Sequence, residues 1–82
     1  QMQRVSGKND PAHALPLLGQ TIRQRREFLG LSQENLASAT GIDRSHMGRI
    51  ERGERNVTLL NLLRIADALE WSLEQLFAAA KL

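Results

Sequence analysis

Hydrophobic residues recur at the three- and four-residue spacing of helices over most of the chain, and runs of β-branched residues are almost absent. The first helix is predicted from about Pro16 to Leu29, with Leu18, Ile22 and Leu29 on its apolar side. Proline is accepted in a first helical turn, and Gly30 is of the residue type that most often ends a helix. This segment is therefore expected to pack one face against a core.

The segment from residue 31 to residue 53 has the pattern of two short helices joined by a tight turn. Ser32 is expected to cap the first of them, because a serine hydroxyl can accept a hydrogen bond from a free backbone amide of the first turn. Leu36 and Ala37 supply its inward face, and Gly41 is expected to end it.

The second of these two helices has two different faces. Asp43 is expected to cap it, and Met47 and Ile50 lie three residues apart on one side. The side that faces away carries Arg44, Ser45, Gly48 and Arg49. Two helices at this spacing form a helix-turn-helix motif.

Two further helices are predicted after Gly53, which is expected to close the second helix of the motif, and a polar loop. Thr58 is expected to cap a fourth helix, whose predicted core positions are Leu59, Leu62, Leu63, Ala66 and Leu69. Ser72 and Gln75 have the spacing of a capping box at the start of a fifth helix, whose predicted inward residues are Leu73, Leu76 and Phe77. Five short helices predict an all-α bundle.

Three sequence motifs carry a family resemblance: GLSQ at 30–33, IERG at 50–53 and ALEWSLEQLF at 68–77. Over about residues 18–77 the chain resembles the Cro and C1-repressor type of helix-turn-helix regulators, which include phage repressors and the controller proteins of restriction-modification systems. The resemblance implies a compact five-helix bundle of the lambda repressor-like type. Asn35 and Trp71 depart from the pattern, since such proteins often have glutamate and a small aliphatic residue there.

Length and composition allow one domain and exclude some sites. The chain has 82 residues and no cysteine, so it has neither a disulfide framework nor a thiolate metal site. Residues 1–14 lack periodicity and are expected to be a flexible leader before a helix-turn-helix domain at residues 15–82. No apolar run reaches the roughly 18 residues of a membrane span, so a cytoplasmic protein with no membrane partner is expected.

Arginine is concentrated in the middle of the chain. The formal net charge is only +2, but seven of the nine arginines lie between Arg23 and Arg55, a stretch that holds five acidic residues. Charge alone is a weak indication of nucleic-acid binding, because an ordinary solvated surface has a similar composition. The position of particular arginines after the turn is the stronger indication.

Arg44, Ser45 and Arg49 are predicted to contact DNA bases, because a helix in the major groove presents its early outward positions to base edges. An arginine can donate two hydrogen bonds to guanine, whereas lysine provides a point charge. Gly48, on the same predicted face, is expected to allow a close approach to DNA. The competing interpretation is that these are solvated surface residues.

A second group is predicted to contact DNA phosphates. Gln33 occupies the first position of a helix, where free amides and the helix dipole favour an anion, and the family resemblance implies a phosphate contact there. The other predicted members are Ser32, His46, Arg52, Arg55 and Asn56. Ser32 is first a helix cap, and a loop arginine is often simply solvated.

The resemblance also implies a structural ion pair. Arg26 of the first helix and Glu51 at the end of the second helix of the motif are expected to join these two elements. Such a pair contributes modestly to stability and more to orientation.

Metal, cofactor and enzyme functions are not expected. His13 and His46 are the only histidines, and neither has a partner at metal-ligand spacing. The sequence also has no glycine-flanked serine elbow and no glycine-rich phosphate loop.

The predicted function is sequence-specific binding of double-stranded DNA by a homodimer that regulates transcription from a palindromic operator. A two-fold partner would double the few base contacts of so small a module. The dimer interface is expected on the fourth and fifth helices, at Leu60, Trp71, Leu76, Ala78 and Leu82. Controller proteins are the closest subgroup in appearance, through Arg44-Ser45 and the stretch 54–62. The alternative is an antitoxin or another protein-interaction module whose main partner is a protein.

Overall fold

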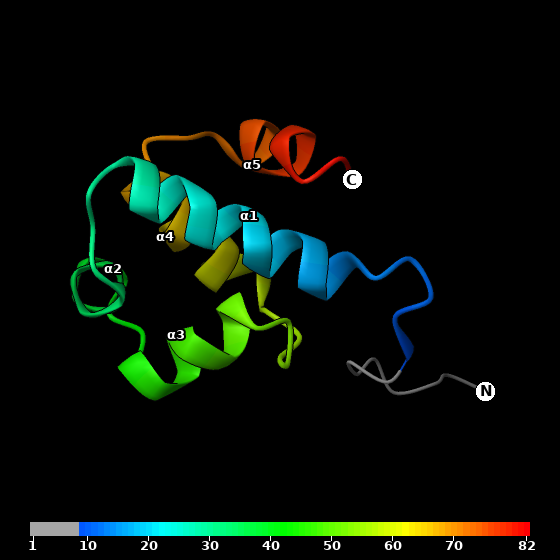
Figure 1. The fold of residues 1–82 in the computed structure, drawn as a ribbon, viewed down its shortest axis with the longest axis horizontal. Coiled ribbons are helices and arrows are strands. Elements are labelled where there is room, and N and C mark those ends of the chain that lie inside the picture. Colours follow the sequence, from blue (N-terminus) through cyan, green and yellow to red (C-terminus); the bar gives the residue numbers. More distant parts are fainter. Residues whose placement is uncertain (1–8) are drawn as a thin grey trace.

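The computed structural model describes residues 9–82 and is all-helical over that range, as the sequence predicts (Figure 1). Residues 1–8, the first part of the expected leader, lie outside the described residues. The five helices are α1 (Ala14–Phe28), α2 (Gln33–Thr40), α3 (Arg44–Glu51), α4 (Leu59–Ala68) and α5 (Leu73–Ala79).

The long helix α1 runs through the middle of the bundle (Figure 1). Helix α5 lies along one side of α1 and α3 lies on the other, while α4 packs against α2 and α5. One apolar core fills the space between them, and its members with no more than 1% exposure are Ile22, Leu36, Met47, Ile50, Ile65, Leu69 and Leu76. The inward positions predicted for the two helices of the motif are therefore confirmed.

The start of α1 differs from the sequence-based prediction. The helix begins at Ala14, two residues before Pro16, and the carboxylate of Asp10 accepts hydrogen bonds from the amides of Ala14 and Leu15 at 2.9 and 2.8 Å. These bonds lower the pKa of Asp10, because they stabilise its charged form. The end of the expected leader is thus part of the helical unit, since Asp10 supplies acceptors for otherwise free amides.

The predicted caps are present at the other helix starts. The Ser32 hydroxyl accepts from the amide of Asn35 at 2.9 Å, and the Asn35 side chain accepts from the amide of Ser32, which completes a capping box. Asparagine therefore takes the role that glutamate or glutamine usually has in a capping box. The same arrangement joins Ser72 and Gln75, and single side-chain caps are present at Asp43 and Thr58.

The core stripe predicted for α4 is partly wrong. Ile65 is fully buried, whereas Leu59 and Leu63 are 61% and 45% exposed. The buried stripe is Leu62, Ile65, Ala66 and Leu69. So many positions of α4 are apolar that two helical phases fit the sequence, and only packing against α2 and α5 distinguishes them.

Two glycines permit α1 to lie close to the end of α3. A Cβ atom at Gly19 would overlap the backbone carbonyl groups of Ile50 and Glu51. One at Gly53, which has a φ of +75°, would lie 2.7 Å from the Cα atom of Pro16. Backbone atoms cannot move aside as side chains do, so these glycines fix how closely α3 packs on α1.

Candidate nucleic-acid interface

The turn between α2 and α3 sets the direction of α3. Gly41 has a φ of +72°, a left-handed conformation that glycine adopts without a steric penalty. The amide of Ile42 then donates to the carbonyl oxygen of Ala37 at 3.1 Å, and the buried Ile42 side chain joins the core. After this turn Asp43 caps α3 by accepting from the amide of His46 at 3.3 Å. A short, capped turn of this kind holds α3 in one orientation.

Arg44, Ser45 and Arg49 lie on the exposed face of α3, as expected. Arg44 forms a 3.7 Å ion pair with Glu34 of α2, and both side chains remain largely exposed. The side chain of Arg49 makes no hydrogen bond or ion pair within residues 9–82. The guanidinium group of Arg49 is thus available to an external acceptor.

Gly48 does not lie on this open face, and its predicted position is wrong. It is buried beneath two side chains, and a Cβ atom there would lie 3.2 Å from Nη1 of Arg52 and 3.4 Å from Oε1 of Gln33. These are side chains that sequence reasoning placed at the phosphate backbone. The glycine makes room for the ends of these two side chains.

The expected ion pair between Arg26 and Glu51 is present and nearly buried. Nε and Nη2 of Arg26 donate to the two carboxylate oxygens of Glu51 at 2.8 and 3.0 Å, and the side chains are 11% and 3% exposed. Nη1 of Arg26 donates to the carbonyl oxygen of Leu31 at 2.9 Å. The hydrogen bonds that Arg26 donates to Glu51 raise the pKa of Arg26, because they stabilise the charged guanidinium.

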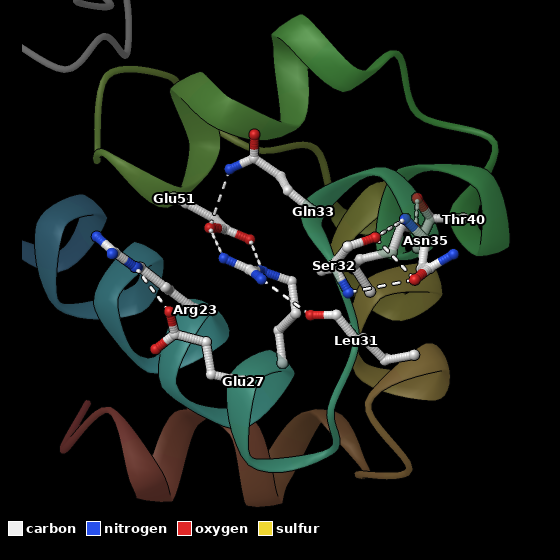
Figure 2. Close-up of polar contacts among 10 residues, drawn as sticks. Arg23, Glu27, Leu31, Ser32, Gln33, Asn35, Thr40 and Glu51 are labelled. Carbon is white, nitrogen blue, oxygen red and sulfur yellow. Dashed lines mark hydrogen bonds and ion pairs between the residues drawn. The ribbon is translucent and has the colours of Figure 1, made fainter.

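Gln33 extends this ion pair into a three-residue network. Its Nε2 atom donates to Oε1 of Glu51 at 3.1 Å, and Figure 2 shows its side chain reaching from the start of α2 toward that carboxylate. Sequence reasoning assigned Gln33 to a phosphate and did not identify this bond. Within residues 9–82 every buried side-chain nitrogen and oxygen has a hydrogen-bond partner, so the network leaves no buried charge unsatisfied.

The remaining predicted phosphate contacts lie at the start of α2, in the first turn of α3 and after the end of α3. Arg52 is exposed and donates to Glu54 at 3.0 Å, and this bond lowers the pKa of Glu54. Arg55 and Asn56 are exposed in the following loop, and His46 is half-buried. Ser32 is exposed, but its hydroxyl is engaged with Asn35 at 2.7 Å.

The residues expected at a dimer interface differ in how exposed they are. Leu76 is fully buried in the core, so its assignment to an interface is wrong. Trp71 is half-buried, packs on the core and lies 4.6 Å from the guanidinium of Arg25, which leaves little of it for a partner. Leu60, Ala78 and Leu82 are exposed, with Leu60 at 63%.

The exposed apolar surface of α4 is larger than expected. Leu59 and Leu63 are exposed together with Leu60 and lie within the first five residues of the same helix. Among residues 9–82 the most exposed large hydrophobic residue is Phe28, at 78%; it lies at the end of α1, with its ring centroid 5.3 Å from the guanidinium of Arg25.

Comparison with known families decides the class of the protein. The sequence profile of the helix-turn-helix family matches residues 22–76, which include the motif and all or part of every helix. The chain belongs to the helix-turn-helix family. The match includes the Arg26–Glu51 network and the exposed face of α3.

Several helix-turn-helix relatives have names that report a role. The control protein C.SmaI of Serratia marcescens is 43% identical over 60 residues, which are 73% of this chain and 71% of the relative. The restriction-modification controller protein C.AhdI from Aeromonas hydrophila has a solved structure with 49% identity and a TM-score of 0.75, over 77% of this chain and 96% of that chain. The biofilm regulator SinR, solved in complex with DNA, is 31% identical with a TM-score of 0.68, over 73% and 97% of the two chains.

These matches confirm the predicted family, and the chain is a DNA-binding helix-turn-helix transcriptional regulator, not an enzyme. No helix within residues 9–82 has both the length and the apolar composition of a membrane span. Over the same residues no three histidine, aspartate or glutamate side chains are placed to hold a metal ion together.

Proposed function

We propose that this regulator binds a specific palindromic operator as a homodimer, with one α3 helix in the major groove of each half-site. The observation that carries the proposal is the set of exposed polar side chains at the start and middle of α3, where the Arg49 side chain has no hydrogen bond or ion pair within residues 9–82. Arginines held on a short helix that follows a fixed turn have the reach and geometry to donate to base edges.

Arg44, Ser45 and Arg49 are the proposed base contacts. The ion pair of Arg44 with Glu34 is exposed and long, so its loss on binding would cost little free energy. Paired hydrogen bonds from either arginine to one guanine would contribute more free energy than this ion pair does, since each good bidentate pair is worth about 1 to 3 kcal/mol of discrimination.

The proposed phosphate contacts surround this face. Gln33 lies in the first turn of α2, where free amides favour an anion, and Arg52, Arg55 and Asn56 follow α3. Ser32 and His46 are placed beside the helix starts and would contribute through their backbone or a free ring nitrogen. Such contacts position the protein on any duplex and do not select a sequence.

The homodimer is proposed to form through α4 and the end of α5. Leu59, Leu60 and Leu63 give α4 an apolar surface that the bundle does not cover, and Ala78 and Leu82 are exposed at the end of the chain described here. An isologous contact would bury this surface in both copies and place two α3 helices for two half-sites. Sedimentation at micromolar concentration should detect the dimer.

The biological role supported best is that of a restriction-modification control protein in the cytoplasm. C.AhdI is named a restriction-modification controller protein and C.SmaI a control protein, and over the matched residues they are 49% and 43% identical to this chain. Selection of bound sites from a random duplex pool at physiological salt tests the DNA proposal. We expect one enriched palindrome with half-sites about one helical turn apart, and an unenriched pool would contradict it.

A second function is favoured by the exposed leucines of α4. If the partner of this surface is a different protein, as in an antitoxin, the chain would be monomeric by itself and would form a complex through Leu59, Leu60 and Leu63. A purified monomer that still binds single half-sites at full affinity would favour this function over the homodimer.

A further inference from the structure

A polar pocket of about 280 Å³ lies where α1, the start of α2 and the end of α3 meet. Its lining residues are Arg23, Arg26, Gln33, Gly48, Glu51 and Arg52. Gly48 keeps it open, because a side chain at this position would project toward the ends of Gln33 and Arg52. The pocket therefore lies beside the C-terminal end of α3, the proposed DNA-binding helix.

Three of the six lining residues are arginines and only one is acidic. The single acid, Glu51, already accepts two hydrogen bonds from Arg26 and one from Gln33. The positive charge that this carboxylate does not balance comes from Arg23 of α1 and Arg52 after α3. A pocket with this charge is suited to an anion.

The present partners of these two arginines are acids outside the pocket lining. Arg23 pairs with Glu27 one turn along α1 at 3.4 Å, with the two side chains 63% and 55% exposed, and Arg52 pairs with Glu54 at 3.0 Å. Figure 2 shows Arg23 and Glu27 side by side on α1. Exposed pairs of this kind are weak, so either guanidinium can exchange its partner at small cost.

We propose that the pocket binds one phosphate of the DNA backbone, and that Arg23 is a phosphate contact together with Arg52 and Gln33. Glu27 is the counterion that the phosphate displaces from Arg23. This inference rests on the proposed DNA-binding function and adds to it a residue of α1. Sequence patterns did not indicate Arg23, because its role depends on α1 lying beside the end of α3.

The first test is the salt dependence of DNA binding by Arg23→Ala, measured on the selected operator and on a random duplex. Each phosphate contact releases counterions and contributes about 0.9 to the slope of log affinity against log salt. Because a homodimer loses one contact in each half-site, Arg23→Ala should reduce that slope by about 1.8 and weaken binding about 60-fold at 0.1 M salt on both duplexes. Arg23→Lys should retain the slope, since it keeps the charge.

The second test locates the contact. Operators with a single neutral methylphosphonate linkage, moved one position at a time, should reveal one linkage per half-site that weakens wild-type binding but weakens Arg23→Ala no further. Glu27→Gln should strengthen DNA binding, because it removes the counterion of Arg23. The matched control Glu74→Gln, at an exposed position of α5, should change DNA binding much less.

An unchanged salt slope for Arg23→Ala, or equal losses for wild type and Arg23→Ala at every neutral linkage, would overturn the role of Arg23. Either result would leave the proposed function intact as long as the wild-type protein still selects an operator. Failure of the wild-type protein to bind DNA would instead refute the proposed function itself.

Discussion

The α1–α3 side of the bundle and the α4 side are stabilised by different kinds of interaction. On the first side, directional bonds among Arg26, Glu51 and Gln33 join three helices, and Gly19 brings backbones into close contact. On the second side, α4 packs through aliphatic side chains and leaves other leucines exposed.

The two sides differ because DNA recognition and assembly have different structural requirements. A helix that presents side chains to base edges must keep a fixed orientation, and hydrogen bonds with defined angles provide it better than non-directional apolar contact does. A surface that another molecule covers needs apolar area instead. Substitutions on the first side should therefore alter stability and the orientation of α3, and those on α4 should alter assembly.

The largest effect is expected from Leu60→Asp on α4. The side chain is 63% exposed, so the monomer should fold and melt almost as the wild type does. A charge in the proposed interface should dissociate the dimer, and loss of two-site binding should weaken operator affinity by about 10² to 10⁴-fold. Sedimentation and DNA titration measure the two effects.

Phe28→Asp is the matched control, because it adds the same charge at a more exposed apolar residue on α1. It should leave the dimer intact. A dimer that survives Leu60→Asp would show that α4 is not the interface.

A smaller effect, on stability, is expected from Glu51→Ala. The substitution leaves the buried guanidinium of Arg26 without its carboxylate and Gln33 without its acceptor. The free energy of unfolding should fall by about 1 to 3 kcal/mol, as measured by denaturant titration. Glu54→Ala, which removes the partner of the exposed Arg52, should leave the unfolding curve nearly unchanged. Equal curves for Glu51→Ala and the wild type would refute the structural role of the pair.

The smallest effect concerns the polar anchor of α1 at Asp10. Its pKa is lowered in the folded protein by hydrogen bonds from Leu15 and Ala14, so the stability that it contributes is present at neutral pH. This contribution should be lost as the pH falls below the ordinary value of 3.8. The stability difference between wild type and Asp10→Asn should therefore shrink on acidification. A difference that is constant from pH 7 to pH 2 would contradict the cap.

The sequence predicted the α1–α3 side better than the α4 side because local signals differ. Ser32, Gly41 and Asp43 are of residue types that are strongly favoured at helix ends. The helix limits could therefore be inferred without tertiary structure. In α4 most positions are apolar, and the choice of Ile65 over Leu59 and Leu63 for the core depends on neighbouring helices.

The candidate contact residues also differ in whether local sequence signals could predict them. The exposed positions of Arg44 and Arg49 follow from helical periodicity. The bond between Gln33 and Glu51, the burial of Gly48 and the pocket beside Arg23 depend on how three helices meet, which periodicity does not determine. Asp10 was missed because its acceptors act across four and five residues rather than from the capping position itself.

The most direct measurement of base contact by α3 is the binding of Arg49→Ala to the selected operator and to random duplex DNA. We expect a loss of about 1 to 3 kcal/mol per half-site on the operator, a relaxed preference at one base pair per half-site in repeated selection, and nearly unchanged binding to random DNA. Equal weakening on both duplexes with an unchanged selected sequence would contradict base recognition by this face of α3.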